Sequence, residues 1–214
     1  MKIGIIGSAA VGKALAKGFI AEGHTVMIGT RDPGREDLVQ FSKENTAAIG
    51  SVEEAAGFGE LIVLCTKGEG AMQALSLAKA ENLASKIIID ATNPIAAKPP
   101  EDGVLHFTTT LDRSMMEDLQ QAFPDAKFVK AFNSVGNTLM YKPDYAGIKP
   151  SMFICGNDDA AKQTVTGILD AFGWETEDMG TAAAARAIEP LCMLWCIPGF
   201  LKNQWSHAFK LLKH

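Results

Sequence analysis

The first residues that could do chemistry form a glycine-containing turn near the N-terminus. The segment Gly7-Ser8-Ala9-Ala10-Val11-Gly12 follows an apolar run and precedes a helix-like stretch. It fits the pattern G-x-G-x-x-G, with Ala9 in the place of the second glycine. In this pattern the first glycine permits a tight turn, the last lets the helix pack on the strand, and the helix N-terminus offers free N–H groups to a pyrophosphate. The turn therefore predicts a dinucleotide site, in which the Ala9 methyl group pushes the pyrophosphate slightly outward.

The same turn has a second interpretation, as a triphosphate-binding loop. Residues 7–13 satisfy G-x-x-x-x-G-K, and Ile87-Ile88-Ile89-Asp90 resembles the strand that carries a magnesium-binding aspartate in such proteins. The next residue, Ala14, lacks the hydroxyl that must bind Mg²⁺. The dinucleotide interpretation is therefore favoured, and Lys13 is expected to be an ordinary, solvated helix lysine.

The end of the second apolar run distinguishes NAD from NADP. An NAD site needs Asp or Glu there to bind the ribose 2′-hydroxyl, but this run ends in Gly29-Thr30-Arg31. The Thr30 hydroxyl and the planar Arg31 cation both suit a 2′-phosphate, and Arg35 could add a second charge. Asp32 is the one contrary residue, unless it caps the turn or pairs with an arginine. These residues favour NADP(H); a merely solvated turn is the alternative.

A protein acid or base is harder to find. Tyr145 and Lys149 have the Tyr-x-x-x-Lys spacing of a helical proton-donor pair, but prolines at 143 and 150 and a glycine at 147 exclude a stable helix. Lys130 lies in an apolar strand, where we expect its amine to extend to solvent rather than enter a pocket. We therefore predict no catalytic residue. Hydride transfer between two stacked rings needs none, whereas reduction of a ketone or an imine would be expected to show one.

Composition excludes several other classes of protein. Of 214 residues 47% are hydrophobic, enough for a sizeable core, and the formal net charge of −5 disfavours a protein that coats nucleic acid. No signal-like segment or uninterrupted run of 18 apolar residues is present, so we expect no membrane partner. The four cysteines are expected to be reduced thiols of a cytoplasmic protein. Cys192 and Cys196 have only His207 nearby, so no metal site is predicted.

The elements that must position these residues follow a repeated strand–helix rhythm. Apolar runs predict strands at residues 2–6, 25–29, 47–49, 61–66, 86–90, 127–132, 151–155 and 175–179. Helices are predicted at residues 11–22, 52–56, 70–83, 112–123 and 159–172. Strands that are apolar on both faces suit a parallel sheet covered by helices. The chain therefore predicts an α/β fold, a Rossmann-type, doubly wound, mostly parallel sheet.

The C-terminal segment differs in character from the rest. We expect residues 1–180 to form the NADP-binding Rossmann domain and residues 181–214 to form a helical segment of the same compact unit, interrupted at Pro198-Gly199. Its apolar side chains are either plain core or a homodimer interface that also walls the acceptor pocket. The second alternative is favoured because Trp, Phe and Met are enriched at interface centres. These side chains are Met193, Trp195, Phe200, Trp205 and Phe209.

Six segments, in order, resemble the coenzyme F420-dependent family of NADP oxidoreductases, which is itself similar to the cytosolic reductase domain of membrane metalloreductases. They are residues 7–12, 29–31, 90–94 (Asp-Ala-Thr-Asn-Pro), 130–135 (Lys-Ala-Phe-Asn-Ser-Val), 153–158 and 184–190 (Ala-Ala-Arg-Ala-Ile-Glu-Pro). The resemblance implies a Rossmann domain that binds NADP(H) and exchanges hydride with F420 or a flavin, a small-molecule acceptor. An imine or small-carbonyl reductase and a non-catalytic NADP(H) sensor are the alternatives.

The resemblance also implies roles for individual residues. The pyrophosphate would be held by Gly7, Ser8, Ala9, Ala10 and Val11, and the 2′-phosphate by Thr30, Arg31 and Arg35. The adenosine side would be bordered by Thr66 and Lys67, and the nicotinamide lined by Asn93, Pro94, Asn133, Ser134 and Val135. Contacts to the second substrate are expected near the C-terminal end.

Overall fold

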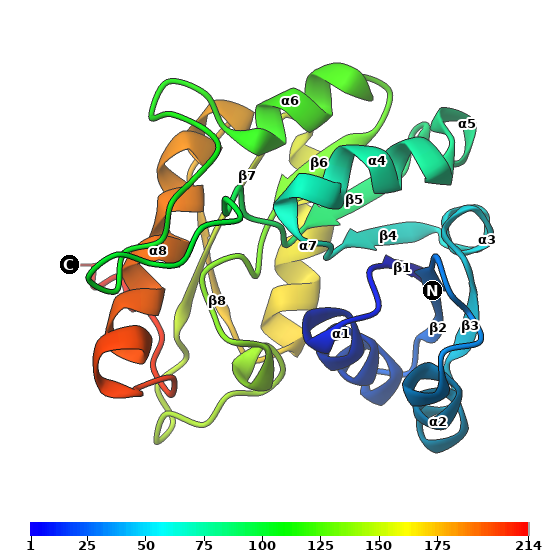
Figure 1. The fold of residues 1–214 in the computed structure, drawn as a ribbon, viewed down its shortest axis with the longest axis horizontal. Coiled ribbons are helices and arrows are strands. Elements are labelled where there is room, and N and C mark those ends of the chain that lie inside the picture. Colours follow the sequence, from blue (N-terminus) through cyan, green and yellow to red (C-terminus); the bar gives the residue numbers. More distant parts are fainter. Residues whose placement is uncertain (214) are drawn as a thin grey trace.

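Eight strands form one sheet in the order β3-β2-β1-β4-β5-β6-β7-β8 (Figure 1). The structure is a computed structural model and describes residues 1–213. All neighbouring strands run parallel except β6 and β7, which are antiparallel. This confirms the mostly parallel, doubly wound α/β fold. The strands are β1 (Lys2–Ile6), β2 (Thr25–Thr30), β3 (Ala48–Ser51), β4 (Leu61–Leu64), β5 (Ile87–Asp90), β6 (Lys127–Lys130), β7 (Ser151–Gly156) and β8 (Glu175–Asp178).

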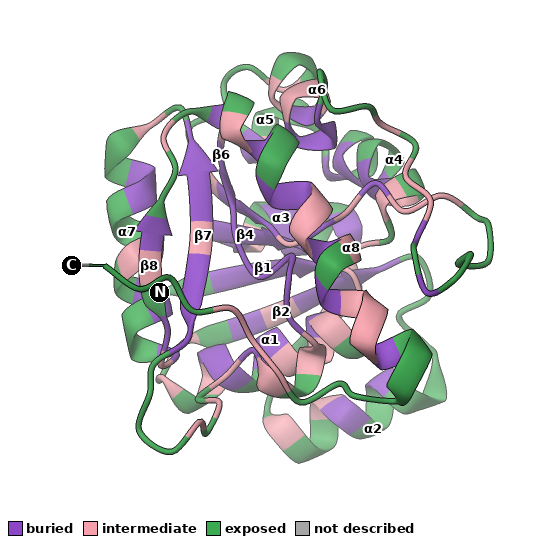
Figure 2. Cartoon of the chain, turned by 90° about the vertical axis from the view of Figure 1, so that its left-hand side faces the viewer, coloured by how far each residue is buried: buried purple, intermediate pink, exposed green. Residues whose placement is uncertain are grey.

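Helices cover both faces of the sheet, because successive side chains of each apolar strand point to opposite sides. One core packs Ile5 and Val63 against α1 (Ala10–Ala21), α2 (Glu36–Asn45) and α7 (Asp159–Ala171). The other packs Ile62 and Ile88 against α3 (Val52–Phe58), α4 (Gly68–Ala78), α6 (Met115–Ala122) and α8 (Ala185–Lys202). Figure 2 shows the buried strands inside and the exposed outer faces of the helices. The remaining short helices are α5 (Ala80–Leu83), η1 (Asn137–Leu139) and η2 (Ala182–Ala184).

Two sequence-based expectations about helices were wrong, and one helix was not predicted. The helix predicted over residues 70–83 is broken at Lys79, whose φ of 67° no right-handed helix allows. The helix α2 was missed, because within it only Leu38 and Phe41 are buried and the apolar pattern is weak. The predicted interruption at Pro198-Gly199 does not occur: α8 continues to Lys202 and ends at Asn203, which has a left-handed φ of 53°.

Residues 203–213 are not helical, which corrects the prediction of a helical segment for this part of the chain. They run back along the start of β7, where the Ser151 N–H donates to the Phe209 carbonyl at 2.9 Å and the Leu211 N–H donates to the Ser151 hydroxyl at 3.1 Å. The indole N–H of Trp195 donates to the His207 carbonyl at 2.8 Å, which ties this strand-like tail to α8.

One stretch of the described residues, Ala182–Lys202, is long and apolar enough to cross a membrane by length and composition. Its mean hydropathy is 1.3 over the best window. In this structure it packs on the sheet and on α6, and its residue Glu189 is buried in an ion pair with Lys130 of β6. A third of this window is buried, so the sheet and α6 cover the helix in part.

Candidate functional site

A cavity of about 450 Å³ opens at the carboxyl ends of β1, β2 and β4. Parallel strands of a doubly wound sheet bind ligands at this edge, beside the point where the strand order reverses. Here the order reverses between β1 and β4. The cavity brings together eight of the predicted residues: Gly7, Ser8, Ala9, Thr30, Arg31, Arg35, Thr66 and Lys67.

The glycine turn has the close approaches that its sequence predicts. Gly7 has a φ of 129°, and a Cβ atom there would lie 2.7 Å from the Cys65 carbonyl oxygen. A Cβ atom on Gly12 would lie 2.0 Å from the Gly7 carbonyl oxygen. Both positions therefore require glycine, the first because of its backbone angle and the second because helix and strand touch.

The start of α1 is open toward this cavity. Its N-cap, Ala9, has no side chain that could accept from the first N–H groups, and the first turn, which contains Ala10 and Val11, has no acidic residue. The helices α2 and α4 also start at the cavity, but Glu36, Asp37 and Glu69 lie in their first turns. The N-terminus of α1 is therefore the one of the three that is suited to an anion.

Thr30, at the tip of β2, organises the turn that follows. Its hydroxyl accepts hydrogen bonds from the Ser8 hydroxyl at 3.2 Å and from the Asp32 N–H at 3.3 Å. The Asp32 carboxylate in turn accepts from the Gly34 N–H at 3.2 Å, so Asp32 caps the turn. Asp32, the one residue of the turn that argued against a 2′-phosphate site, therefore stabilises the turn backbone.

The two arginines of this turn differ in what they already contact. Arg35 donates to the Ser8 carbonyl at 3.0 Å and pairs with Asp37, which Lys13 also contacts at 2.6 Å. Arg35 and Lys13 together hold the pKa of the Asp37 carboxyl well below its usual range. Arg31 lines the cavity and makes no hydrogen bond or ion pair within residues 1–213. Arg31 is therefore free to meet an anionic ligand, as is Lys67 on the far side of the cavity, whose ammonium also lacks a partner within residues 1–213.

Thr66 and Lys67 follow β4 on the far side of the cavity. The Thr66 hydroxyl is buried and has no hydrogen-bond partner among the residues that the structure describes. An unpaired buried hydroxyl is costly unless a ligand satisfies it. The preceding thiol, Cys65, donates to the Ile6 carbonyl, and burial raises its pKa to about 12. Cys65 therefore lines the cavity as an uncharged thiol and is not a nucleophile.

The predicted nicotinamide-side residues form a second group, outside this cavity, after β5 and β6. The Asn93 amide donates to the Asn133 carbonyl at 2.7 Å. The Asn133 amide donates to the Asn93 side-chain oxygen at 3.1 Å and to the Ile188 carbonyl of α8 at 2.9 Å. The side-chain oxygen of Asn133 is buried and has no hydrogen-bond partner among the described residues. The other members of this group are all buried: Pro94, Ser134 and Val135.

The expectation that Lys130 extends to solvent was wrong. Its side chain is fully buried, and its ammonium contacts Asp90 at 2.7 Å, Glu189 at 3.0 Å and the Thr92 carbonyl at 3.0 Å. Burial alone would lower the pKa of Lys130, but the two carboxylates outweigh it and raise that pKa. The parallel register pairs Asp90 directly with Lys130, which is the signal that the sequence analysis missed.

The segment Ala-Arg-x-x-Glu fixes α8 on α6. Glu189 accepts from the N–H groups of Met115 and Met116, the first two residues of α6, at 3.0 Å each. Arg186 makes a two-pronged pair with Glu117 of α6 at 2.7 and 2.9 Å, which with a backbone hydrogen bond lowers the pKa of Glu117 to about 2.

Tyr145 and Lys149, which the sequence analysis excluded as a proton-donor pair, lie in a non-helical loop, where Lys149 pairs with Asp170.

Comparison with known proteins identifies relatives over the whole chain. The family model described as "NADP oxidoreductase coenzyme F420-dependent" matches residues 2–94. A crystal structure from Arthrobacter sp. FB24, of a protein provisionally described as an F420-dependent NADP reductase, is 32% identical, covers 100% of both chains and has a TM-score of 0.92.

Two further relatives are more distant in length or in sequence. Metalloreductase STEAP3 of Rattus norvegicus is 32% identical over 94% of this chain, and the chain spans 39% of that protein's length. An imine reductase from Streptomyces aurantiacus is 16% identical, with a TM-score of 0.66 over 94% of this chain and 63% of that one. At that identity the likeness concerns the fold alone.

Proposed function

The chain belongs to the coenzyme F420-dependent family of NADP oxidoreductases, and from this premise we propose that it transfers hydride between NADP(H) and a deazaflavin or flavin ring. Membership of this family makes the chain an NADP-dependent oxidoreductase, as its sequence predicts. The identity of the hydride acceptor is what we propose. The observation that carries the proposed cofactor site is the free Arg31 guanidinium, which shares one cavity with Thr30 and the uncapped start of α1. The cavity residues fit a phosphorylated dinucleotide, because they leave a cation and the buried Thr66 hydroxyl without partners.

In this proposal each group of residues at the carboxyl ends of the strands binds one part of the cofactor. The N–H groups of residues 7–11 bind the pyrophosphate. Arg31 and Thr30 bind the 2′-phosphate, and Arg35, which shares its partner Asp37 with Lys13, supplies a second cation. Thr66 and Lys67 border the adenosine, and the group around Asn93 and Asn133 lines the nicotinamide. Bound NADPH supplies the hydride. The protein orients the ring and excludes water, and it needs no proton donor if the acceptor is a second ring system.

Cofactor preference gives the first test of this assignment. Arg31→Ala removes one charge-assisted contact to the 2′-phosphate, which typically costs about 1.5–3 kcal/mol. We expect the preference for NADPH over NADH to narrow by roughly tenfold to a hundredfold. Calorimetric titration of both cofactors measures it, and Arg113→Ala, at an exposed arginine paired with Asp118, is the matched control. Equal affinity of the unmodified protein for NADPH and NADH would contradict the assignment.

A panel of acceptors tests the reaction itself. NADPH oxidation is followed with F420, FMN, FAD, riboflavin, ferric complexes and imines. Turnover with the deazaflavin or a flavin supports the proposal. Turnover with imines alone would support an imine reductase, and tight NADPH binding without turnover on any acceptor would support a sensor.

We also propose that residues 1–180 carry the cofactor and that the C-terminal segment joins two copies of the chain in a dimer. We propose a cytoplasmic location, where the four free thiols stay reduced. Trp195 is buried and belongs to the core, but Leu194, Phe200 and Leu201 of α8 are exposed. Apolar residues of this kind are typical of interface centres, and a two-fold dimer is the commonest assembly. Light scattering at micromolar concentration is expected to give twice the chain mass of 22.8 kDa. A mass of one chain, unchanged by concentration, would contradict the dimer.

A further inference from the structure

The ends of β5 and β6 and the first turn of α8 meet at the nicotinamide-side group, and one buried ion cluster joins them. Asp90 ends β5 three residues before Asn93, and Lys130 ends β6 three residues before Asn133. The ammonium of Lys130 contacts Asp90, and also the carbonyl of Thr92, the residue next to Asn93. Lys130 therefore fixes the two strand ends on which the asparagines are carried.

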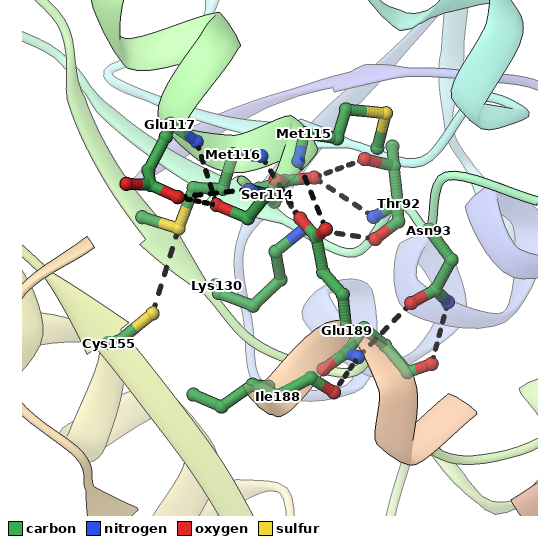
Figure 3. A network of polar contacts seen from close by, with 12 residues as sticks. Thr92, Asn93, Ser114, Met115, Met116, Glu117, Lys130, Cys155, Ile188 and Glu189 are labelled. Atoms are coloured by element: carbon green, nitrogen blue, oxygen red, sulfur yellow. Dashed lines mark hydrogen bonds and ion pairs between the residues drawn. The ribbon is translucent and has the colours of Figure 1, made fainter. Parts of the chain in front are cut away.

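Glu189 adds α8 to this cluster. Figure 3 shows its carboxylate between the Lys130 ammonium and the start of α6, where it accepts two backbone N–H groups. The helix N-terminus stabilises the second negative charge, which one lysine alone does not neutralise. The neighbouring residue in α8, Ile188, presents the carbonyl that accepts from the Asn133 amide. The position of Glu189 thus sets the position of that carbonyl.

The Asn133 side chain is held in one orientation by these contacts. Both hydrogens of its amide are used, on Asn93 and on Ile188, so the amide oxygen is fixed as well. That oxygen is buried without a partner in residues 1–213, and Asn133 is only 4% exposed. The preceding residue, Phe132, has a φ of 62°, a strained angle for a bulky side chain. Strain and an unsatisfied acceptor at one point are typical of a ligand site.

We propose that Glu189 is a positioning residue for the nicotinamide: through Ile188 it orients Asn133, whose free oxygen accepts a hydrogen bond from the nicotinamide carboxamide. This rests on the proposed NADP(H) function. It gives the Ala-Arg-x-x-Glu segment two separate roles. Arg186 and Glu117 attach α8 to α6 at the surface, whereas Glu189 acts on the cofactor end of the edge.

Binding of two ligands tests the proposal without any acceptor. NADPH carries a further phosphate, a second ribose and the nicotinamide, all of which 2′,5′-ADP lacks. The Kd of 2′,5′-ADP divided by the Kd of NADPH therefore reports the contacts of the nicotinamide half of the cofactor. We expect Glu189→Gln to reduce this ratio about five- to tenfold, the value of a hydrogen bond, while 2′,5′-ADP affinity stays within about twofold. Asn133→Ala is expected to give the same loss, and the double variant no further loss, because both act through one contact.

Glu117→Gln is the matched control, since it weakens the other carboxylate contact between the same two helices. It should leave the ratio unchanged. If Glu189→Gln does not fold, Glu189→Asp, which keeps the charge but shortens its reach, takes its place. An equal effect of Glu117→Gln, an equal loss of both ligands, or multiplied losses in the double variant would overturn the proposal. Failure of the unmodified protein to bind 2′,5′-ADP would instead contradict the proposed function.

Discussion

Gly12→Val is expected to weaken NADPH binding by roughly a hundredfold or more. A Cβ atom at this position lies 2.0 Å from the Gly7 carbonyl oxygen, a backbone atom that cannot rotate away. The side chain therefore has to push α1 from β1, and this displaces both the glycine turn and the N–H groups that meet the pyrophosphate. A displacement that costs about 2.7 kcal/mol of binding already corresponds to a hundredfold loss. Calorimetry with NADPH measures the effect.

A second helical glycine provides the control for this variant. A Cβ atom on Gly167, in α7, meets nothing within 4 Å, so Gly167→Val introduces the same side chain without a clash. It should bind NADPH normally. The milder change Ala9→Gly should also be tolerated and is expected to tighten binding slightly. Normal NADPH affinity in folded Gly12→Val would show that the turn does not hold the cofactor.

Lys130→Met is expected to lower the free energy of unfolding by about 3–5 kcal/mol. Methionine keeps an unbranched apolar side chain, one atom shorter than that of lysine, but leaves the Asp90 and Glu189 carboxylates buried without their cation. Urea unfolding followed by circular dichroism measures the loss.

The same strand offers a matched control for the buried cluster. Lys127 also lies in β6 but pairs with Asp158 at the surface, and an exposed pair contributes under about 1 kcal/mol. Lys127→Met should therefore be nearly neutral. If both variants lost the same stability, the buried cluster would not be an anchor of the fold.

The sequence predicted well those features that depend on local pattern. Runs such as Leu61–Leu64 and Ile87–Asp90 identify buried parallel strands because they are apolar on both faces. The glycine turn and the end of β2 identify the cofactor side because their chemistry lies within a few consecutive residues. Eight predicted residues consequently line one cavity.

Features that depend on distant partners could not be predicted in this way. Lys130 resembles an ordinary strand lysine until Asp90 and Glu189, 40 and 59 residues away in the chain, are placed beside it. The continuation of α8 through Pro198 contradicts local propensity, and the contacts of Glu189 and Trp195 with the rest of the chain hold that helix in place. A strand pairing of Asp90 with Lys130 was the one readable sign, because two opposite charges end neighbouring apolar runs.

Transfer of a deuterium label tests the central claim most directly. The protein is incubated with F420 and NADPH that carries deuterium on one face of nicotinamide C4, with each face labelled in a separate reaction. The reduced deazaflavin is analysed by mass spectrometry and NMR. Hydride passed between two stacked rings keeps its label, because C–H bonds at the deazaflavin carbon do not exchange with water. We predict that the reduced acceptor carries the deuterium on that ring carbon, from one face of the nicotinamide only. An unreduced deazaflavin, or one that is unlabelled in both reactions, would contradict the account.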